Sequence, residues 1–208
     1  MHMLYEDEAL VLCEKPAGII SEEGGMPVLL RKALGGEIYC VHRLDRETGG
    51  LMVYARTKEA AATISEAIAQ GRLEKEYLAV TEGEVPKEGT LRDLLYRDAA
   101  KNKTYVVNRL RKGVREAELS YERLACREGL SLLRIRLQTG RSHQIRVQFA
   151  SRRFPLVGDR KYGSRYRDVQ LALWSVRLCL PHPESGKPVE GQLRPPELWP
   201  WTLFSELL

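Results

Sequence analysis

The pattern of apolar and polar positions along the chain predicts strands more often than helices. Apolar runs at 9–13 and 51–55 have the length of buried strands, and the first is followed by a Pro-Ala-Gly turn. Apolar and polar residues alternate at 75–80, 117–125 and 130–137, which is the period of a strand. An Arg-Glu-Gly turn separates the last two runs, so they predict a β-hairpin.

Helical spacing is clear in one segment, residues 58–70. Thr57 is a typical N-cap for this segment, and Gly71 is typical of the position just past a helix C-terminus. A Leu-rich piece at 28–34 predicts one or two further helical turns.

The other segments give weaker patterns. Residues 89–113 are polar and basic, which predicts a loop followed by an edge strand at 104–107. Residues 169–180 alternate well enough for a final long strand. Trp199 and Trp201 lie in a C-terminal tail and are expected to cover the sheet.

These elements predict an α+β protein with a mixed, mainly antiparallel sheet and a few flanking helices. A length of 208 residues suits one domain, residues 1–208, with a substantial core. No apolar run approaches the roughly 20 residues that a membrane-spanning helix needs, which excludes membrane insertion. The acidic N-terminus lacks a secretory pattern, so the expected location is the cytoplasm. We expect a monomer with no obligate protein partner.

The four cysteines lie far apart and form no Cys-x-x-Cys pair. This spacing argues against a structural zinc site and against a disulfide framework. We therefore expect Cys13, Cys40, Cys126 and Cys179 to be reduced and mostly buried packing residues.

The net charge of +5 is unevenly distributed along the chain. Residues 141–177 contain nine Lys or Arg against two Asp, a net charge of +7, so the remainder of the chain sums to −2. A basic surface of this kind is typical of proteins that bind a polyanion such as RNA, although a solvated basic face remains the alternative.

One carboxylate stands out as a candidate for chemistry. Asp45 lies between Arg43 and Arg46, just ahead of two glycines and the buried run at 51–55. This places Asp45 on a loop carried by rigid structure, where catalytic groups are often found. The alternative is that Asp45 caps a turn or pairs with one of the two arginines at the surface.

The motif His-Arg-Leu-Asp at 42–45, followed by Thr48 and Gly50, resembles the signature segment of the RluA-type pseudouridine synthases. Further segments resemble the same family in the same order, from about residue 9 to nearly the end. They are Lys15-Pro16-Ala17-Gly18, Lys75-Glu76-Tyr77-Leu78-Ala79, Thr139-Gly140-Arg141-Ser142-His143-Gln144-Ile145-Arg146, Gly158-Asp159 and Tyr162-Gly163.

The sequence departs from the family pattern in two places. The family usually has Ser where this chain has Gly49, and Leu-His-Ala where this chain has Leu-Ala-Leu at 171–173. Neither departure touches the proposed chemistry, but both bear on loop stiffness and substrate fit.

The resemblance implies a bisected sheet with the active cleft across it and the isomerisation of uridine in ribosomal or transfer RNA to pseudouridine. This reaction needs neither a metal nor another cofactor. It implies that Asp45 is the catalytic residue, acting either as a nucleophile or as a base that removes a sugar proton. It also implies that RNA is held by the catalytic domain itself, without the additional N-terminal module of many relatives.

Two further catalytic roles come from the resemblance. Tyr77 matches the residue that stacks on the flipped-out base, and Arg146 matches the arginine that pairs with the catalytic aspartate. From its residue type alone, a tyrosine in a strand is more often a core side chain.

Gly140 permits a tight bend, and Ser142 is a candidate cap of the helix that follows.

We expect the basic residues near these motifs to hold RNA phosphates. The expected RNA-binding residues are Arg43, Arg141, His143, Arg152, Arg153, Arg160, Lys161 and Arg165.

Two other functions compete with this interpretation. A non-catalytic RNA-binding protein would keep the basic stretch without needing Asp45, Tyr77 and Arg146 together. A metal-dependent nuclease could use His42, Asp45 and His143, but such sites normally gather several carboxylates.

Overall fold

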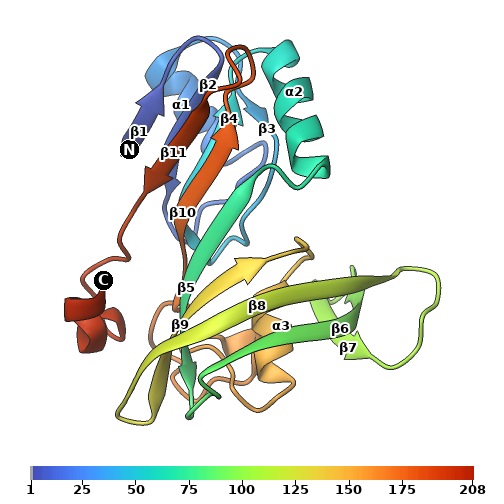
Figure 1. Ribbon diagram of the computed structural model, residues 1–208, viewed down its shortest axis with the longest axis vertical. Helices are drawn as coiled ribbons and strands as arrows, with labels where there is room; N and C mark the ends of the chain where they lie inside the picture. Colours follow the sequence, from blue (N-terminus) through green and yellow to red (C-terminus); the bar gives the residue numbers. More distant parts are fainter. Residues whose placement is uncertain (1) are drawn as a thin grey trace. The chain divides into compact units, whose positions relative to one another are not determined.

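The computed structural model describes residues 2–208 and shows an α+β protein with a mixed sheet, as the sequence predicts. The chain forms two compact units (Figure 1). Unit 1 contains Met1–Glu76 and Trp174–Arg194, and unit 2 contains Tyr77–Leu173 and Pro195–Leu208. The single domain expected from the length stays a prediction. No helix among the described residues is long and apolar enough to span a membrane.

The sheet of unit 1 has the strand order β1-β2-β4-β10, with β3 beside β4 and β11 beside β10. The strand β4 pairs in parallel with β10, and the other pairs in this unit are antiparallel. Every residue of β4 is buried, which confirms the predicted buried strand. The bounds are β1 (Met3–Glu6), β2 (Leu10–Lys15), β3 (Tyr39–Cys40), β4 (Gly49–Ala55), β10 (Leu173–Pro181) and β11 (Pro188–Gln192).

Unit 1 also contains the helices α1 (Met26–Leu34) and α2 (Lys58–Ala69). The Thr57 hydroxyl accepts a hydrogen bond of 3.0 Å from the backbone N–H of Ala60, and Gly71 adopts a positive φ just after the helix. Both predicted ends of α2 are therefore confirmed. The buried side of α2 joins one core cluster with β2 and β4.

The sheet of unit 2 has the order β5-β9-β8-β6-β7. The strands β8 and β9 form the predicted antiparallel hairpin, whose turn residues Glu128 and Gly129 both have positive φ, as a tight turn between twisted strands requires. The bounds are β5 (Glu74–Glu82), β6 (Glu88–Asp98), β7 (Lys103–Val107), β8 (Val114–Arg127), β9 (Leu130–Leu137), the helix α3 (Gln144–Ala150) and the 3-10 helices η1 (Arg160–Tyr162) and η2 (Trp201–Leu207).

The structure corrects the prediction of a loop from residue 89 to the edge strand. Residues 88–98 form β6, which pairs antiparallel with β8 and with the edge strand β7. Only Leu91 and Leu95 are buried in β6, so polar and half-buried side chains hide the strand period. The backbone groups of β6 are hydrogen-bonded to β8, a distant segment, so the local sequence does not indicate this strand.

Two smaller expectations are also corrected. The N-cap of α3 is His143 in a left-handed conformation, so Ser142 does not cap this helix. All four cysteines are free, but only Cys13 is buried. Trp201 is buried, and Trp199 is 36% exposed and packs against the ring of Tyr166, so their expected cover of the sheet stays a prediction.

Candidate active site

Asp45 lies on the loop between β3 and β4, and this loop is bonded to the segment that follows β2. The Ser21 hydroxyl is fully buried, donates to the Leu44 carbonyl at 2.9 Å and accepts from the Leu44 N–H at 3.0 Å. On the other side of Asp45, the Arg46 carbonyl accepts from the Gly18 N–H at 2.7 Å. The backbone is therefore held directly before and after Asp45, while its side chain is half-buried.

Lys15 is the buried cation of this arrangement. Its ammonium donates to the carbonyls of Ile19, Pro16 and Arg46 at 2.7, 3.0 and 3.2 Å, and its side chain has no exposed surface. An ammonium has three donors and no acceptor, so these three carbonyls use its full capacity. Lys15 thereby joins the end of β2 to the residue next to Asp45.

Burial lowers the pKa of Lys15 to about 8, and the negative charges of Asp45, Glu47 and Glu22 oppose this effect. The positive charge is therefore close enough to Asp45 to interact with it electrostatically. The loop of Asp45 therefore combines a backbone held by hydrogen bonds with a buried positive charge nearby.

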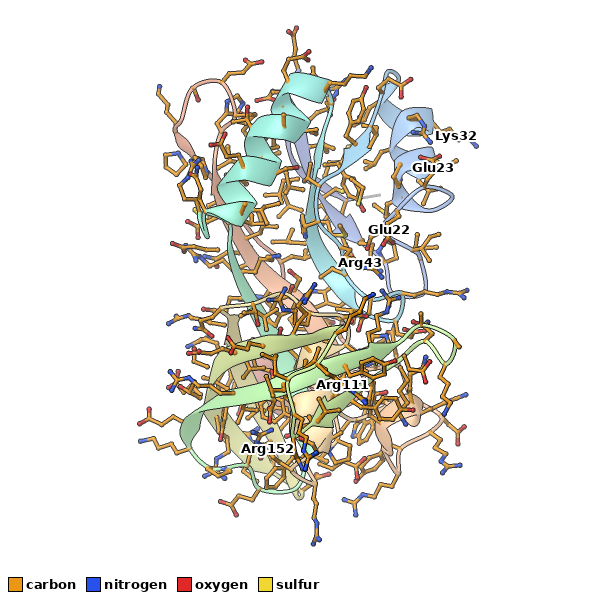
Figure 2. The ribbon with its side chains drawn as sticks, turned by 90° about the vertical axis from the view of Figure 1, so that its right-hand side faces the viewer. Glu22, Glu23, Lys32, Arg43, Arg111 and Arg152 are labelled. Atoms are coloured by element: carbon orange, nitrogen blue, oxygen red, sulfur yellow. The ribbon has the colours of Figure 1, made fainter. Side chains whose placement is uncertain are left out.

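His42 and Arg43 have structural partners. The His42 Nε2 accepts a hydrogen bond of 3.1 Å from the Val53 N–H, and burial lowers the pKa of His42 well below its usual value. A neutral histidine bonded in this way supports β4. Arg43 forms an ion pair of 2.9 Å with Glu22, and Figure 2 shows the two residues beside each other.

Gly49 and Gly50 let β4 and β10 approach closely. A Cβ on Gly49 would lie 2.2 Å from the indole of Trp174, and a Cβ on Gly50 would lie 2.3 Å from the carbonyl oxygen of Ser175. The indole of Trp174 thus occupies the space that a serine side chain at position 49 would need. This contact gives a physical reason for one of the two departures from the family pattern.

Unit 2 contains Arg146, whose guanidinium is held by Asp159. The Nε donates to Asp159 Oδ2 at 2.7 Å and the Nη2 donates to Oδ1 at 2.9 Å, and neither side chain is more than 4% exposed. Its Cζ also lies 5.3 Å from the ring centroid of Tyr162. A two-point pair of this kind fixes the plane of the guanidinium.

The Tyr162 hydroxyl connects three elements of unit 2. It lies 2.8 Å from His143 Nδ1, accepts from the Thr104 N–H at 2.8 Å and lies 3.2 Å from the Thr104 carbonyl. These contacts tie β7, the start of α3 and η1 together. His143, expected to contact RNA, is only 8% exposed and helps to form this connection.

The predicted residues are divided between the two units. Asp45 and Arg43 belong to unit 1, and Tyr77, Arg146 and the other expected RNA-binding residues belong to unit 2. Tyr77 is 5% exposed. The predicted pair between Asp45 and Arg146 would join the two units and stays a prediction.

Many of the expected RNA-binding side chains are engaged within the protein. Arg141 donates to the Glu116 carbonyl, and Lys161 donates to the Asn102 carbonyl. Arg153 is exposed and has a positive φ. The ion pairs among the others are Arg152–Asp93, Arg160–Asp168 and Arg165–Glu82.

Sequence reasoning gave no role to Lys15 or Asp159. Both lie in segments that resemble the family, beside Pro16 and Gly158. The sequence offers two signals for them, a lysine two residues after the apolar run at 9–13 and a lone aspartate after a glycine. Their burial, 0% exposed for Lys15 and 1% for Asp159, is visible only in the folded chain.

The model of the RNA pseudouridylate synthase family matches residues 9–151. This match covers more than half of the chain, and the chain belongs to this family. The resemblance read from the motifs is thereby confirmed.

The chain is 30% identical to the ribosomal large subunit pseudouridine synthase D of Haemophilus influenzae, over 91% of this chain and 66% of that protein. It is 38% identical to an uncharacterized RNA pseudouridine synthase of Chloroflexus aurantiacus, over 74% and 50% of the two chains. It is 29% identical to the tRNA pseudouridine synthase C of Pectobacterium carotovorum, over 93% and 59%. The chain thus spans about half to two thirds of the length of these curated relatives.

Two solved human structures resemble the fold. RNA pseudouridylate synthase domain containing 4 gives a TM-score of 0.78 at 23% identity, over 94% of this chain and 88% of that one. RNA pseudouridylate synthase domain containing 1 gives 0.80 at 22% identity, over 95% and 84%. At these identities the likeness shows the fold alone, and it confirms the predicted class.

Replacing Lys15 by Met should remove a pH dependence of stability. The folded pKa of about 8 lies below the usual 10.5, so the unfolded chain binds more protons between these values. The free energy of unfolding of the parent should therefore rise with pH across this window, and the rise should be smaller in Lys15→Met. Urea unfolding at several pH values gives this comparison, and parallel curves for the two proteins would contradict it.

Asp159→Asn should destabilise the protein by about 3 kcal/mol, because it removes the charge of a buried carboxylate that holds the Arg146 guanidinium at two points. Asp168→Asn is the matched control, since Asp168 is fully exposed and lies 3.8 Å from Arg160. Denaturant unfolding should show no measurable change for this control. Equal destabilisation of the two variants would mean that the buried Arg146–Asp159 pair contributes no more to the free energy of unfolding than the exposed pair.

Gly49→Ser should cost about 1–3 kcal/mol of stability, because the new side chain overlaps the indole of Trp174. The same substitution in a Trp174→Leu background should cost much less. A double-mutant cycle in the free energy of unfolding measures this coupling. Additive costs would show that the indole does not exclude a side chain at position 49.

Proposed function

We propose that the chain isomerises uridine in RNA to pseudouridine with Asp45 as its catalytic carboxylate. The observation that carries the proposal is the placement of Asp45, which is half-buried on a loop. The backbone of this loop is hydrogen-bonded on both sides of Asp45, and the Lys15 ammonium interacts with Asp45 electrostatically. A catalytic group must be held within a fraction of an ångström of its productive position, and this loop supplies that rigidity.

The reaction breaks the bond from the ribose C1′ to uracil N1 and forms a bond from C1′ to C5. The proton on C5 is lost and N1 gains one, so no atoms enter or leave. Asp45 acts either by attacking C1′ or by removing a sugar proton, and both routes use the ionised carboxylate. In both routes the target base leaves its stack before it reaches the site.

Arg146 and Tyr77 complete the proposed site. Asp159 uses the Nε and Nη2 side of the Arg146 guanidinium, and the Nη1 and Nη2 side of the same fork has the geometry to pair with a second carboxylate, for which we propose Asp45. The ring of Tyr77 is proposed to stack on the flipped uracil. This assignment gives both residues the roles that the family resemblance implies.

The RNA substrate belongs to the ribosomal or transfer classes, since relatives named for both classes match this chain. The particular uridine is found by mapping pseudouridines in a strain that lacks the gene. His42 does not favour the nuclease alternative, because its Nε2 lone pair, with which a neutral imidazole would bind a metal, accepts the Val53 N–H.

Asp45→Asn should bind uridine-containing RNA at least as well as the parent and form no pseudouridine. The substitution removes a negative charge from a polyanion site, so affinity should not fall, while the ionised group needed for chemistry is removed. Nucleoside analysis after incubation measures turnover, and a binding assay with the same RNA measures affinity. Appreciable pseudouridine formation by this variant would refute the role of Asp45.

If the parent protein binds RNA but leaves every uridine unchanged, the non-catalytic alternative is correct. Turnover that persists in the presence of a chelator excludes the metal-dependent nuclease. Glu59→Gln is a suitable companion variant, since Glu59 is exposed on α2 and the variant should retain turnover.

A further inference from the structure

The net positive charge of the protein is confined to unit 2. Unit 1 has 12 Lys or Arg against 15 Asp or Glu, a formal charge of −3, and unit 2 has 21 against 13, a charge of +8. Within unit 2, residues 97–115 contain seven Lys or Arg and a single acidic residue, Asp98. These residues run from the end of β6 through β7 to the start of β8.

The cations of this segment differ from those at 141–177 in their partners. Five of the nine Lys or Arg described at 141–177 pair with carboxylates, as in Arg146–Asp159 and Arg152–Asp93. Within residues 2–208, no Lys or Arg of 97–115 forms an ion pair with a carboxylate side chain. Their charge is therefore not neutralised by the protein.

Aromatic side chains accompany these cations. Tyr96 of β6 is paired in register with Tyr105 of β7, so the two half-buried rings lie on the same face of the sheet. The Arg111 guanidinium lies 5.1 Å from the ring centroid of Tyr96, and Figure 2 shows Arg111 against the strands of unit 2. Lys103 lies 5.7 Å from the centroid of Tyr105.

The connection between β7 and β8 extends past the ends of the strands (Figure 1). Arg109, Arg111 and Lys112 are exposed there, and Leu110 of the same connection is 70% exposed. A loop of this kind presents several positive charges without competing carboxylates. Arg111 of this loop contacts the ring of Tyr96, which is paired with Tyr105.

We propose that this surface, formed by Tyr96, Lys103, Tyr105, Arg109, Arg111 and Lys112, binds unpaired RNA that flanks the target uridine. The surface is named the basic hairpin surface. Exposed cations hold successive phosphates, and aromatic rings accept bases that are out of a helix, which is the combination found in single-strand binding proteins. This inference rests on the proposed function, because RNA is taken as the substrate.

The test compares two double variants that each remove two positive charges. Arg109→Ala with Lys112→Ala changes the basic hairpin surface, and Lys32→Ala with Lys58→Ala changes exposed lysines on α1 and α2. The affinity for a uridine-containing single-stranded RNA is measured over a range of salt concentrations. Neither pair has a side-chain partner in the described chain, so both variants should fold, and thermal unfolding verifies this.

The first double variant should bind more weakly, and its slope of log affinity against log salt should shrink by about 1.4, at roughly 0.7 for each phosphate that the protein no longer neutralises. The control should keep the parent slope. Tyr96→Ala should weaken binding by about fivefold or more because a stacking surface is removed, while Tyr96→Phe retains it. Equal slopes for the two double variants, or parent affinity in Tyr96→Ala, would overturn the proposal.

Binding is measured apart from turnover, so the outcomes for this surface and for the proposed function are distinguishable. A protein that forms no pseudouridine but shows the expected salt slopes keeps the basic hairpin surface and loses the enzymatic proposal. A protein that forms pseudouridine with unchanged slopes in the first double variant keeps its activity and loses the surface.

Discussion

The hydrogen bonds of the buried Lys15 ammonium hold the candidate site of unit 1 together. Three carbonyls from two separate segments converge on one cation, and one of them belongs to the residue next to Asp45. An apolar side chain would fill the same volume but would leave buried carbonyls without donors, which costs more than the packing returns. The loop that carries Asp45 therefore depends on a charge that is expensive to bury, and this cost appears in the lowered pKa of Lys15.

The cations of unit 2 fall into two groups, those that have a carboxylate partner within the protein and those that do not. Arg146 and Arg152 are held by Asp159 and Asp93 in two-point pairs, so they set the geometry of the protein itself. The described cations around the β7–β8 connection have no such counterions and are available to an external polyanion. Net charge along the sequence does not distinguish these groups, because a paired arginine and an unpaired one count equally.

The close approach of β4 and β10 shows how a local departure from a family pattern is absorbed. Trp174 fills the space beside Gly49, and the parallel pairing of Trp174 with Gly49 and of Ser175 with Gly50 keeps the strands in contact directly after the Asp45 loop. The indole at position 174 fits because position 49 has no side chain, so the two residues depend on each other.

The sequence by itself determined the elements whose signals are local. The period and caps of α2, the apolar run of β4 and the turn between β8 and β9 involve residues a few positions apart, and the motifs around Asp45 identified the family. Only the tertiary structure decided that β6 is a strand, that Lys15 is buried and that Asp159 is a partner of Arg146. These features depend on hydrogen bonds and burial contributed by distant segments. Such contacts produce no periodic pattern of apolar and polar residues in the local sequence.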